Sequence, residues 1–313
     1  MRNGWFRTVL GDVPTEQCGL ILPHEHLFTD LRGPEADRYA QADPEQVLSV
    51  ILPYLQEAQK AGVTAMVECS TVGVGRNIEM LRMLAKNTQV HILAPTGLYR
   101  EDFIPQNFRY QAVEDIADFF TLEITRGIGM SGSKAGFIKI AMSNDGPRPI
   151  EERNLRAAAL ASMSTGAAIA SHTIGGKAAM QELDILMDEG CSLDKFIWVH
   201  AGSEPDKNIH IKAASQGAYV EFDSIGSSEG NEETINAVLN LLEQGYGERI
   251  LLSHDAGWFQ PGQPGGEPEH GLRGYTDLMK DFIPQLKKIG IEEKIIDMIT
   301  KDNPRRVFAI PAQ

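Results

Sequence analysis

The chain of 313 residues is long enough for one large α/β barrel or for two small domains. Hydrophobic residues make up 42% of it and charged residues 23%, which argues against disorder and allows a sizeable core. The formal net charge of −14 argues against a nucleic-acid partner and an anionic membrane surface, because both attract Lys and Arg.

The amino-terminal residues and the cysteines indicate in which cellular compartment to expect the protein. Residues 1–5 carry no apolar signal core, and the chain has no run of about 18 apolar residues that could span a membrane. The cysteines number three and are well separated, with no CxxC pair, which fits a reducing environment. We therefore expect a cytoplasmic protein without a membrane segment.

Short strand-like runs alternate with helical patterns along the chain. The runs are Cys18–Leu22, Val63–Cys69, Val90–Ala94, Gly136–Ala141, Ala167–Ser171, Phe196–His200, Ala218–Phe222 and Ile250–Ser253. The helical stretches that follow them are Pro44–Ala61, Arg76–Ala85, Gln111–Arg126, Ile150–Ser164, Lys177–Glu189, Asp206–Ser215, Glu232–Gln244 and Asp277–Lys288. A last helix over Ile291–Thr300 is expected to stop before Asn303-Pro304.

Eight β-then-α units predict a parallel sheet, and eight is the number that closes a (β/α)₈ barrel. The alternative is an open doubly wound sheet, which would need a GxGxxG phosphate loop after an early strand. Gly73-Val74-Gly75 is too short to be that loop. With no linker and no internal repeat, we expect residues 1–313 to form a single barrel domain.

Polar side chains follow five of the strand-like runs, at the ends where barrel enzymes keep their active sites. They are His24, His26, Lys139, His172, His200 and Asp255. Two histidines at i and i+2 in an extended chain point the same way, so His24 and His26 can reach one cation. Lys139 lies in the apolar string Phe-Ile-Lys-Ile-Ala, where an unpaired ammonium is costly. Each residue alone could be structural, but their joint placement predicts one metal pocket.

In chain order, the motifs HxH, intrastrand Lys, SH, VHAG and SHD resemble the phosphotriesterase family of the amidohydrolase superfamily. The resemblance runs from Thr8-Val9-Leu10-Gly11-Asp12 to Asn303-Pro304-Arg305-Arg306. It implies a site for two divalent metal ions and a bridging hydroxide. The implied ligands are His24, His26 and Asp255 for the more buried ion, His172 and His200 for the exposed ion, and a CO₂-carboxylated Lys139 bridging both.

The implied chemistry agrees with the donor atoms. Neutral imidazoles and carboxylates suit Zn²⁺, with Mn²⁺, Co²⁺ and Fe²⁺ as alternatives. A carbamate would turn the cationic Lys139 into a bidentate anion and so remove the burial problem of an amine. Two cations lower the pKa of a shared water, and Asp255 can accept the proton that leaves the nucleophile.

Two positions bear on which family branch the chain follows. Tyr99 matches the tyrosine that the quorum-lactone branch places beside its metals, where phosphotriesterases proper tend to carry Trp. Ser224, directly after Asp223, departs from both branches, because acyl-homoserine lactonases have Arg there and phosphotriesterases have His.

A long loop rich in Gly and Pro, residues 256–274, follows the eighth run and is expected to set substrate choice. It contains Arg273, followed by Tyr275, and Arg100 comes directly after Tyr99. Guanidinium groups form bidentate hydrogen bonds with phosphate and carboxylate groups, so these arginines could bind an anionic lactone. The plain alternative is that each Arg is a solvated surface residue.

We therefore expect a lactonase or carboxyl-ester hydrolase acting on a small, polar, sugar-like substrate that can carry a phosphate. Weak phosphotriesterase activity should accompany it. One alternative is a phosphotriesterase proper. The other is a metal-binding barrel without catalysis, and the complete ligand set argues against this second alternative. The family habit predicts a homodimer.

Overall fold

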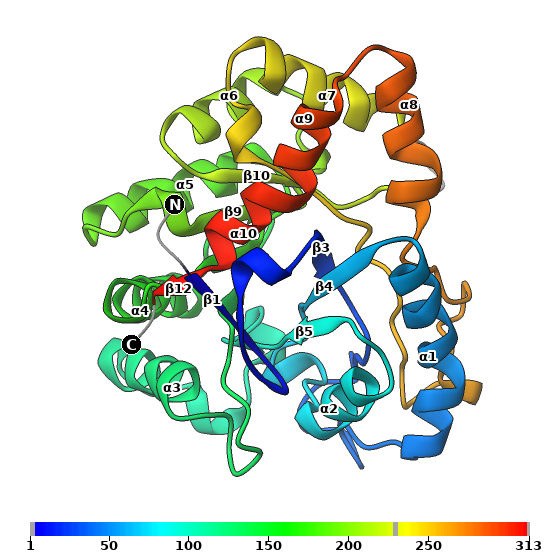
Figure 1. Ribbon diagram of the computed structural model, residues 1–313. Helices are drawn as coiled ribbons and strands as arrows, with labels where there is room; N and C mark the ends of the chain where they lie inside the picture. The colour runs from blue at the N-terminus through cyan, green and yellow to red at the C-terminus, as the bar shows by residue number, and fades with distance from the viewer. Residues whose placement is uncertain (1–3, 228–230, 312–313) are drawn as a thin grey trace.

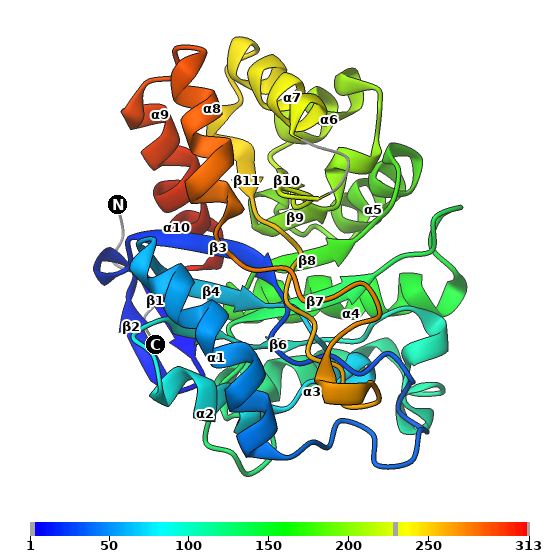
Figure 2. The same cartoon turned by 90° about the vertical axis from the view of Figure 1, so that its right-hand side faces the viewer.

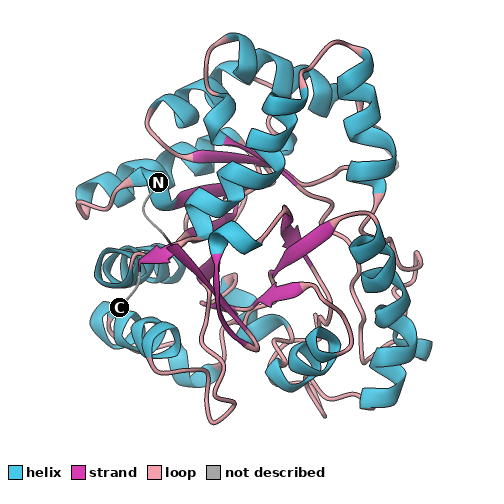
Figure 3. Cartoon of the chain, viewed as in Figure 1, coloured by secondary structure: helices cyan, strands magenta, loops and turns pink. Residues whose placement is uncertain are grey.

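The structure is a computed structural model that describes residues 4–227 and 231–311. Its barrel strands are β3 (Leu20–Glu25), β4 (Val63–Glu68), β5 (His91–Leu93), β6 (Pro95–Thr96), β7 (Phe137–Ala141), β8 (Ile169–His172), β9 (Phe196–Val199), β10 (Tyr219–Phe222) and β11 (Ile250–Leu252). The helices are α1 (Pro44–Lys60), α2 (Ile78–Lys86), α3 (Val113–Thr125), α4 (Pro149–Thr165), α5 (Gly176–Asp188), α6 (Lys207–Ser215), α7 (Glu232–Glu243), α8 (Ile283–Lys288), α9 (Glu293–Asp297) and α10 (Asn303–Phe308). The helices lie outside the strands (Figures 1 and 3).

The parallel strands form two ladders in the described chain. One joins β3, β4 and β5, and the other joins β6 through β11 in sequence order. Because β5 and β6 are separated only by Ala94, they are two pieces of one strand position, and the ladders together supply eight positions. The predicted (β/α)₈ barrel is confirmed, and the side view shows the strands enclosed by helices (Figure 2).

The barrel closes between β11 and β3 without a regular ladder in the described residues. Individual bonds beyond the strand ends join the two instead. The amide of His26 donates to Ala256 O at 2.9 Å, and the amide of Asp255 donates to His24 O at 3.2 Å. The closing seam is therefore built from residues of the predicted metal pocket.

Alternation along each strand divides the core into two clusters. On β9, Ile197 and Val199 belong to an inner cluster in the barrel lumen, whereas Phe196 and Trp198 pack outward beneath the helices. Helix starts follow capping rules, as where the Asp43 side chain accepts from Glu45 N at the start of α1. No helix in residues 4–227 and 231–311 has both the length and the apolarity needed to cross a membrane.

A small antiparallel sheet was missed from sequence. It pairs β1 (Gly4–Thr8) with β2 (Gly11–Pro14) and with β12 (Ile310–Pro311) from the other end of the chain. Phe6 of β1 joins the inner cluster, so the sheet helps to fill the lumen. Strands this short, paired across almost the whole sequence, carry no periodic signal.

The prediction that Asn303-Pro304 stops the last helix was wrong. A π-helical turn, Met298–Asp302, follows α9, and α10 then begins at Asn303. Pro304 lies in the first turn of α10, where a missing amide hydrogen costs no helical hydrogen bond. The proline therefore begins a helical segment instead of ending one.

Candidate metal centre

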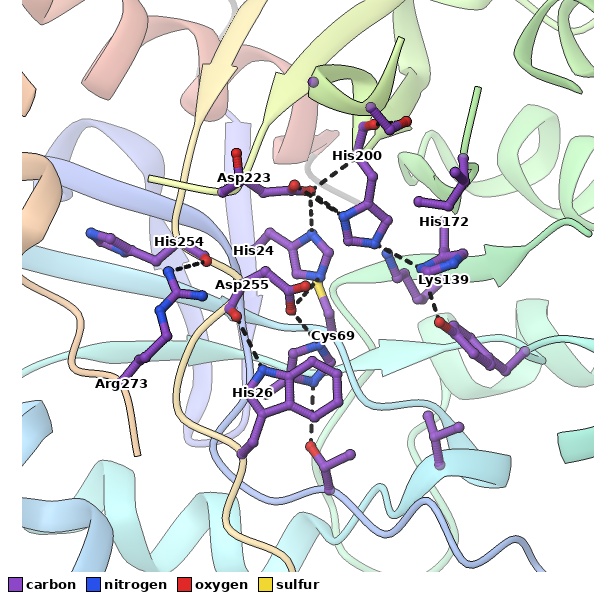
Figure 4. Close-up of a pocket in the computed structure, with 18 of the residues that line it drawn as sticks. His24, His26, Cys69, Lys139, His172, His200, Asp223, His254, Asp255 and Arg273 are labelled. Atoms are coloured by element: carbon purple, nitrogen blue, oxygen red, sulfur yellow. Dashed lines mark hydrogen bonds and ion pairs between the residues drawn. The ribbon is translucent and has the colours of Figure 1, made fainter. Parts of the chain in front are cut away.

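A cavity of about 340 Å³ lies at the carboxyl-terminal ends of the barrel strands. The structure brings all of the sequence-predicted ligands to it: His24, His26, Lys139, His172, His200 and Asp255. Figure 4 shows them pointing toward one another from several different strands. This is the face on which barrel enzymes carry their active sites.

Strand alternation alone does not bring every ligand into the lumen. Lys139 follows the inner residue Phe137 by two positions, so alternation points it inward. His200 follows the inner residue Val199 directly and should face outward. It instead adopts a left-handed backbone with φ of 63°, as does Asp255 with φ of 50°. These two turns aim their side chains into the cavity.

The inner nitrogens of the histidines face one another or Asp255. His200 Nε2 lies 2.7 Å from His172 Nδ1. Asp255 Oδ1 lies 3.2 Å from His26 Nε2 and 3.6 Å from His24 Nε2. Burial, followed by the charge of Lys139, lowers the pKa of His24 to about 4. Neutral imidazoles whose free nitrogens converge are the donors that a divalent cation takes.

The outer nitrogens of three histidines are held by acceptors. His24 Nδ1 lies 3.1 Å from Asp223 Oδ2, and His200 Nδ1 lies 3.0 Å from Asp223 Oδ1. His26 Nδ1 lies 2.9 Å from Ser70 Oγ, which in turn donates to Glu68 Oε1 at 2.6 Å. Metal-binding histidines characteristically donate their second ring N–H in this way.

Two buried acids share the outer side of His24. Glu221 Oε1 also lies 3.0 Å from His24 Nδ1. Burial and the neighbouring Asp223 raise the pKa of Glu221 well above its usual range. Burial opposes ionisation of Asp223 too, but His200 and His24 hold its pKa well below the usual range. The pair therefore splits into one neutral and one ionised carboxyl.

Lys139 provides the test of whether metal fits this site. Its side chain is 1% exposed, and Nζ has no hydrogen-bond partner among the described residues. Asp255 Oδ1 is also buried and faces the ring nitrogens of His24 and His26. A buried amine without a hydrogen-bond partner is unfavourable unless another group is bound beside it. The residues of the site therefore fit a divalent metal ion.

His172 is held differently from the other histidines. Its Nδ1 lies 2.9 Å from Tyr99 Oη, and Arg100 Nη2 lies 2.6 Å from its Nε2. A guanidinium can only donate, so His172 Nε2 must accept in this arrangement. Arg100 also donates to Asn144 Oδ1 at 2.9 Å and does not line the cavity. To meet a substrate, Arg100 would have to leave His172.

The other predicted substrate residues differ in their positions. Arg273 lines the cavity, and its Nη2 donates to Ile225 O and His254 O, while Nε is buried without a partner in the described chain. Tyr99 and Asp223 also line the cavity. Tyr275 does not; it is fully buried and donates to the backbone of His26.

One side of the cavity is apolar. Trp258 lies against His26 with ring centroids 4.2 Å apart and ring planes tilted by 40°, and its indole donates to Asp255 O at 3.1 Å. Leu31, Val74 and Ile174 extend this apolar side of the cavity. They lie on loops, where no periodicity marks a lining position. Glu221 could have been identified from the sequence, because it precedes Asp223 by two positions in the extended run Val-Glu-Phe-Asp and so shares its side of the strand.

The sequence matches the Phosphotriesterase family over residues 4–308. It is 30% identical to the phosphotriesterase homology protein of Mycobacterium tuberculosis (strain CDC 1551 / Oshkosh), with 96% of each chain covered. It is 29% identical to the aryldialkylphosphatase of Saccharolobus solfataricus, with 95% of this chain and 97% of that protein covered.

A solved structure supports the same assignment. It is described as molecular engineering of organophosphate hydrolysis activity from a weak promiscuous lactonase template. It superimposes with a TM-score of 0.88 at 29% identity, covering 97% of this chain and 99% of the other. Together with the convergence of histidines, lysine and aspartate at the barrel mouth, these matches show that the chain belongs to the phosphotriesterase family.

Proposed function

We propose that this phosphotriesterase-family hydrolase cleaves a lactone or carboxyl ester of a small polar molecule, with two divalent metal ions as its cofactor. The ions would be held by His24, His26, Lys139, His172, His200 and Asp255. The single observation that carries the proposal is the burial of Lys139 Nζ in a histidine-lined cavity without any hydrogen-bond partner in the described chain.

Bound there, the ions would lower the pKa of a shared water and polarise the carbonyl that is cleaved. The remaining work belongs to the chain. The ammonium of Lys139 would first lose a proton, and the neutral amine would then react with CO₂ and lose a second proton to give a carbamate whose oxygens could serve as metal ligands. That reaction would remove the cost of burying an unpaired ammonium. Asp223 and Ser70 would fix the ring orientations of the histidines they contact.

Asp255 is the proposed proton acceptor. Its side chain is 25% exposed, whereas those of His24 and His26 are 1% and 9% exposed. It therefore combines contact with the histidines and access to the cavity mouth. A carboxylate so placed can take a proton from the nucleophile and pass it to solvent.

The cavity favours a compact substrate with one polar end. At about 340 Å³ it is near the lower limit of about 300 Å³ for small-molecule sites, which suits a ring-sized lactone better than a long acyl chain. One wall is apolar, with Trp258 and Leu31, and Ser203, Ser224 and Arg273 line other parts. The partnerless Nε of Arg273 supports a role in holding a substrate phosphate or carboxylate.

Phosphotriester hydrolysis is the alternative function, favoured by the similarity to an aryldialkylphosphatase. Ser224 argues that this activity is weak, because it lines the cavity where the phosphotriesterase branch has a histidine. The lactonase template among the similar structures supports the same order of preference.

The test is a side-by-side measurement of kcat/KM on metal-reconstituted protein. The panel contains sugar lactones with and without phosphate, acyl-homoserine lactones, aryl esters and paraoxon-like triesters. We expect sugar lactones to be the best substrates. A kcat/KM for the triester or the acyl-homoserine lactone more than tenfold above that for sugar lactones would contradict the proposal. Metal binding without turnover of any member would favour a non-catalytic barrel.

Zn²⁺ is the proposed metal, since nitrogen and carboxylate donors suit it, with Mn²⁺, Co²⁺ and Fe²⁺ as alternatives for reconstitution. Elemental analysis should give about two ions per chain, the number in a two-metal site. A homodimer is proposed from the habit of the family, and sedimentation equilibrium of the purified protein tests it.

A further inference from the structure

Glu25 lies between His24 and His26 on β3 but does not line the cavity. Because side chains alternate along a strand, the two histidines face the cavity and Glu25 faces the adjoining chain. Its carboxylate is fully buried, with an exposed fraction of 0%. A carboxylate in this position needs several donors, and all of them come from the segment that follows β11.

The carboxylate of Glu25 accepts four hydrogen bonds from residues on both sides of Asp255. Oε1 accepts from Ser253 Oγ at 2.8 Å, from His254 N at 3.1 Å and from His254 Nδ1 at 2.5 Å. Oε2 accepts from Ala256 N at 3.0 Å. The backbone amides of His254 and Ala256, which flank Asp255 in sequence, thus donate to different oxygens of the same carboxylate.

This arrangement controls a backbone conformation that Asp255 would not adopt readily by itself. The φ of 50° at Asp255 lies in the left-handed region, which disfavours residues other than glycine. Bonds from the amides of His254 and Ala256 to one rigidly placed carboxylate fix the peptide planes around that residue. They therefore fix the direction in which the Asp255 side chain leaves the backbone.

The same contacts add to the backbone bonds at the closing seam, where the described residues of β11 and β3 form no ladder. Ser253 Oγ adds to them by accepting from His24 N at 3.0 Å while its hydrogen goes to Glu25. The segment from Ser253 to Ala256 is therefore positioned by side-chain bonds to β3 as well as by backbone bonds.

We propose that Glu25 is a positioning residue that holds Asp255 in the conformation needed to meet a metal ion together with His24 and His26. The inference rests on the proposed function, because it concerns the ligand geometry of that site. Glu25 itself does not line the cavity.

Glu25→Gln tests the proposal, because it keeps the size of the side chain and replaces one acceptor oxygen with a donor. The new amide group would meet an N–H of His254 or Ala256, so one flanking contact must break. Glu123→Gln is the matched control. Glu123 is also a buried acid, but it pairs with Arg76 and does not line the cavity.

Metal binding is measured by competition with a coloured chelator, with Zn²⁺ as the probe. We expect the wild type and Glu123→Gln to bind two ions alike. Glu25→Gln should retain one ion and bind the other about ten- to a hundredfold more weakly, as for other outer partners of metal ligands. Binding of both ions by Glu25→Gln within threefold of the wild type would overturn the proposal, leaving Glu25 a purely structural seam residue.

Hydrogen exchange of the metal-free wild type keeps the proposal testable if Glu25→Gln does not fold. We expect the amides of His254 and Ala256 to be protected before metal is added, since Glu25 already holds them. Free exchange of both amides in the metal-free protein would overturn the proposal. Failure of the wild type to bind metal would overturn the proposed function and this inference together, whereas normal wild-type binding with an unaffected Glu25→Gln overturns only the inference.

Discussion

Glu182 on α5 is a buried acid whose titration should govern how stability depends on pH. Its side chain is 0% exposed and accepts hydrogen bonds from the hydroxyls of Ser171 and Thr173, which flank His172. Burial raises the pKa of Glu182 from 4.5 to about 8. At neutral pH the carboxyl is therefore protonated in the folded state and ionised in the unfolded state.

The sign and size of the effect follow from linkage. Between pH 4.5 and about 8 the folded state binds one more proton than the unfolded state, so the free energy of unfolding falls as the pH rises. One pKa unit corresponds to about 1.4 kcal/mol, and the loss therefore accumulates to about 5 kcal/mol by pH 8. Below pH 4.5 the loss is absent.

Glu182→Gln cannot ionise and should not show this loss. We expect the variant to approach wild-type stability at pH 5 and to exceed it by a few kcal/mol at pH 8 to 9, an estimate that follows from the same linkage. Urea unfolding at equal metal loading across pH 5 to 9 measures both proteins. Glu123→Gln is the control, because it leaves Arg76 without its carboxylate partner and should destabilise the protein at neutral pH. Parallel pH profiles for the wild type and Glu182→Gln would refute the reasoning.

Three further predictions concern the cavity. Lys139→Ala should lose metal and activity together, and short carboxylates added back should partly restore both; a variant that keeps two ions by elemental analysis would contradict the carbamate. Asp255→Asn should lower kcat by about two orders of magnitude or more, and a near-normal rate with intact metal would remove its role as proton acceptor. Arg273→Ala should lower kcat/KM for a phosphorylated sugar lactone about ten- to a hundredfold while changing that for the neutral lactone little. Equal losses on both lactones would show that Arg273 holds no substrate anion.

The sequence predicts most of this barrel because its signals are local. Alternation within a strand identifies Lys139 as a lumen residue two positions after Phe137, and the i, i+2 spacing places His24 and His26 on the same side. His200 shows the limit of that reasoning. A strict alternation after Val199 would turn it outward, and only its left-handed backbone, a tertiary feature, directs it into the cavity.

Neighbouring positions in sequence were a weaker guide to the substrate residues. Arg100 follows Tyr99, which lines the cavity, but its side chain reaches the far nitrogen of His172 instead. Tyr275 follows Arg273 by two positions, but it is buried against the backbone of His26. Loop residues have no fixed period, so the direction of each side chain depends on contacts that the sequence does not reveal.

The acids around the cavity went unnoticed for a different reason. Glu25, Glu68, Glu182 and Glu221 are each buried, and Glu25 and Glu221 contact residues about 200 positions away in sequence. A charged residue in an apolar run signals that a partner exists, but it does not name the partner. The donors become identifiable only when the strand ends meet.

These acids suit the change of charge that the proposed cofactor would bring. Lys139 lines the cavity together with Asp255 and Asp223. Carbamylation would reverse the sign of Lys139, and that loss of positive charge would be offset by two divalent ions. Asp223 contacts the outer nitrogens of His24 and His200, so its negative charge would stabilise a cation bound by these rings without itself being a ligand. Histidines whose inner nitrogens face one another and whose outer nitrogens face buried carboxylates can therefore serve both the metal-free and the metal-bound site. The same rings packed against apolar side chains would suit neither.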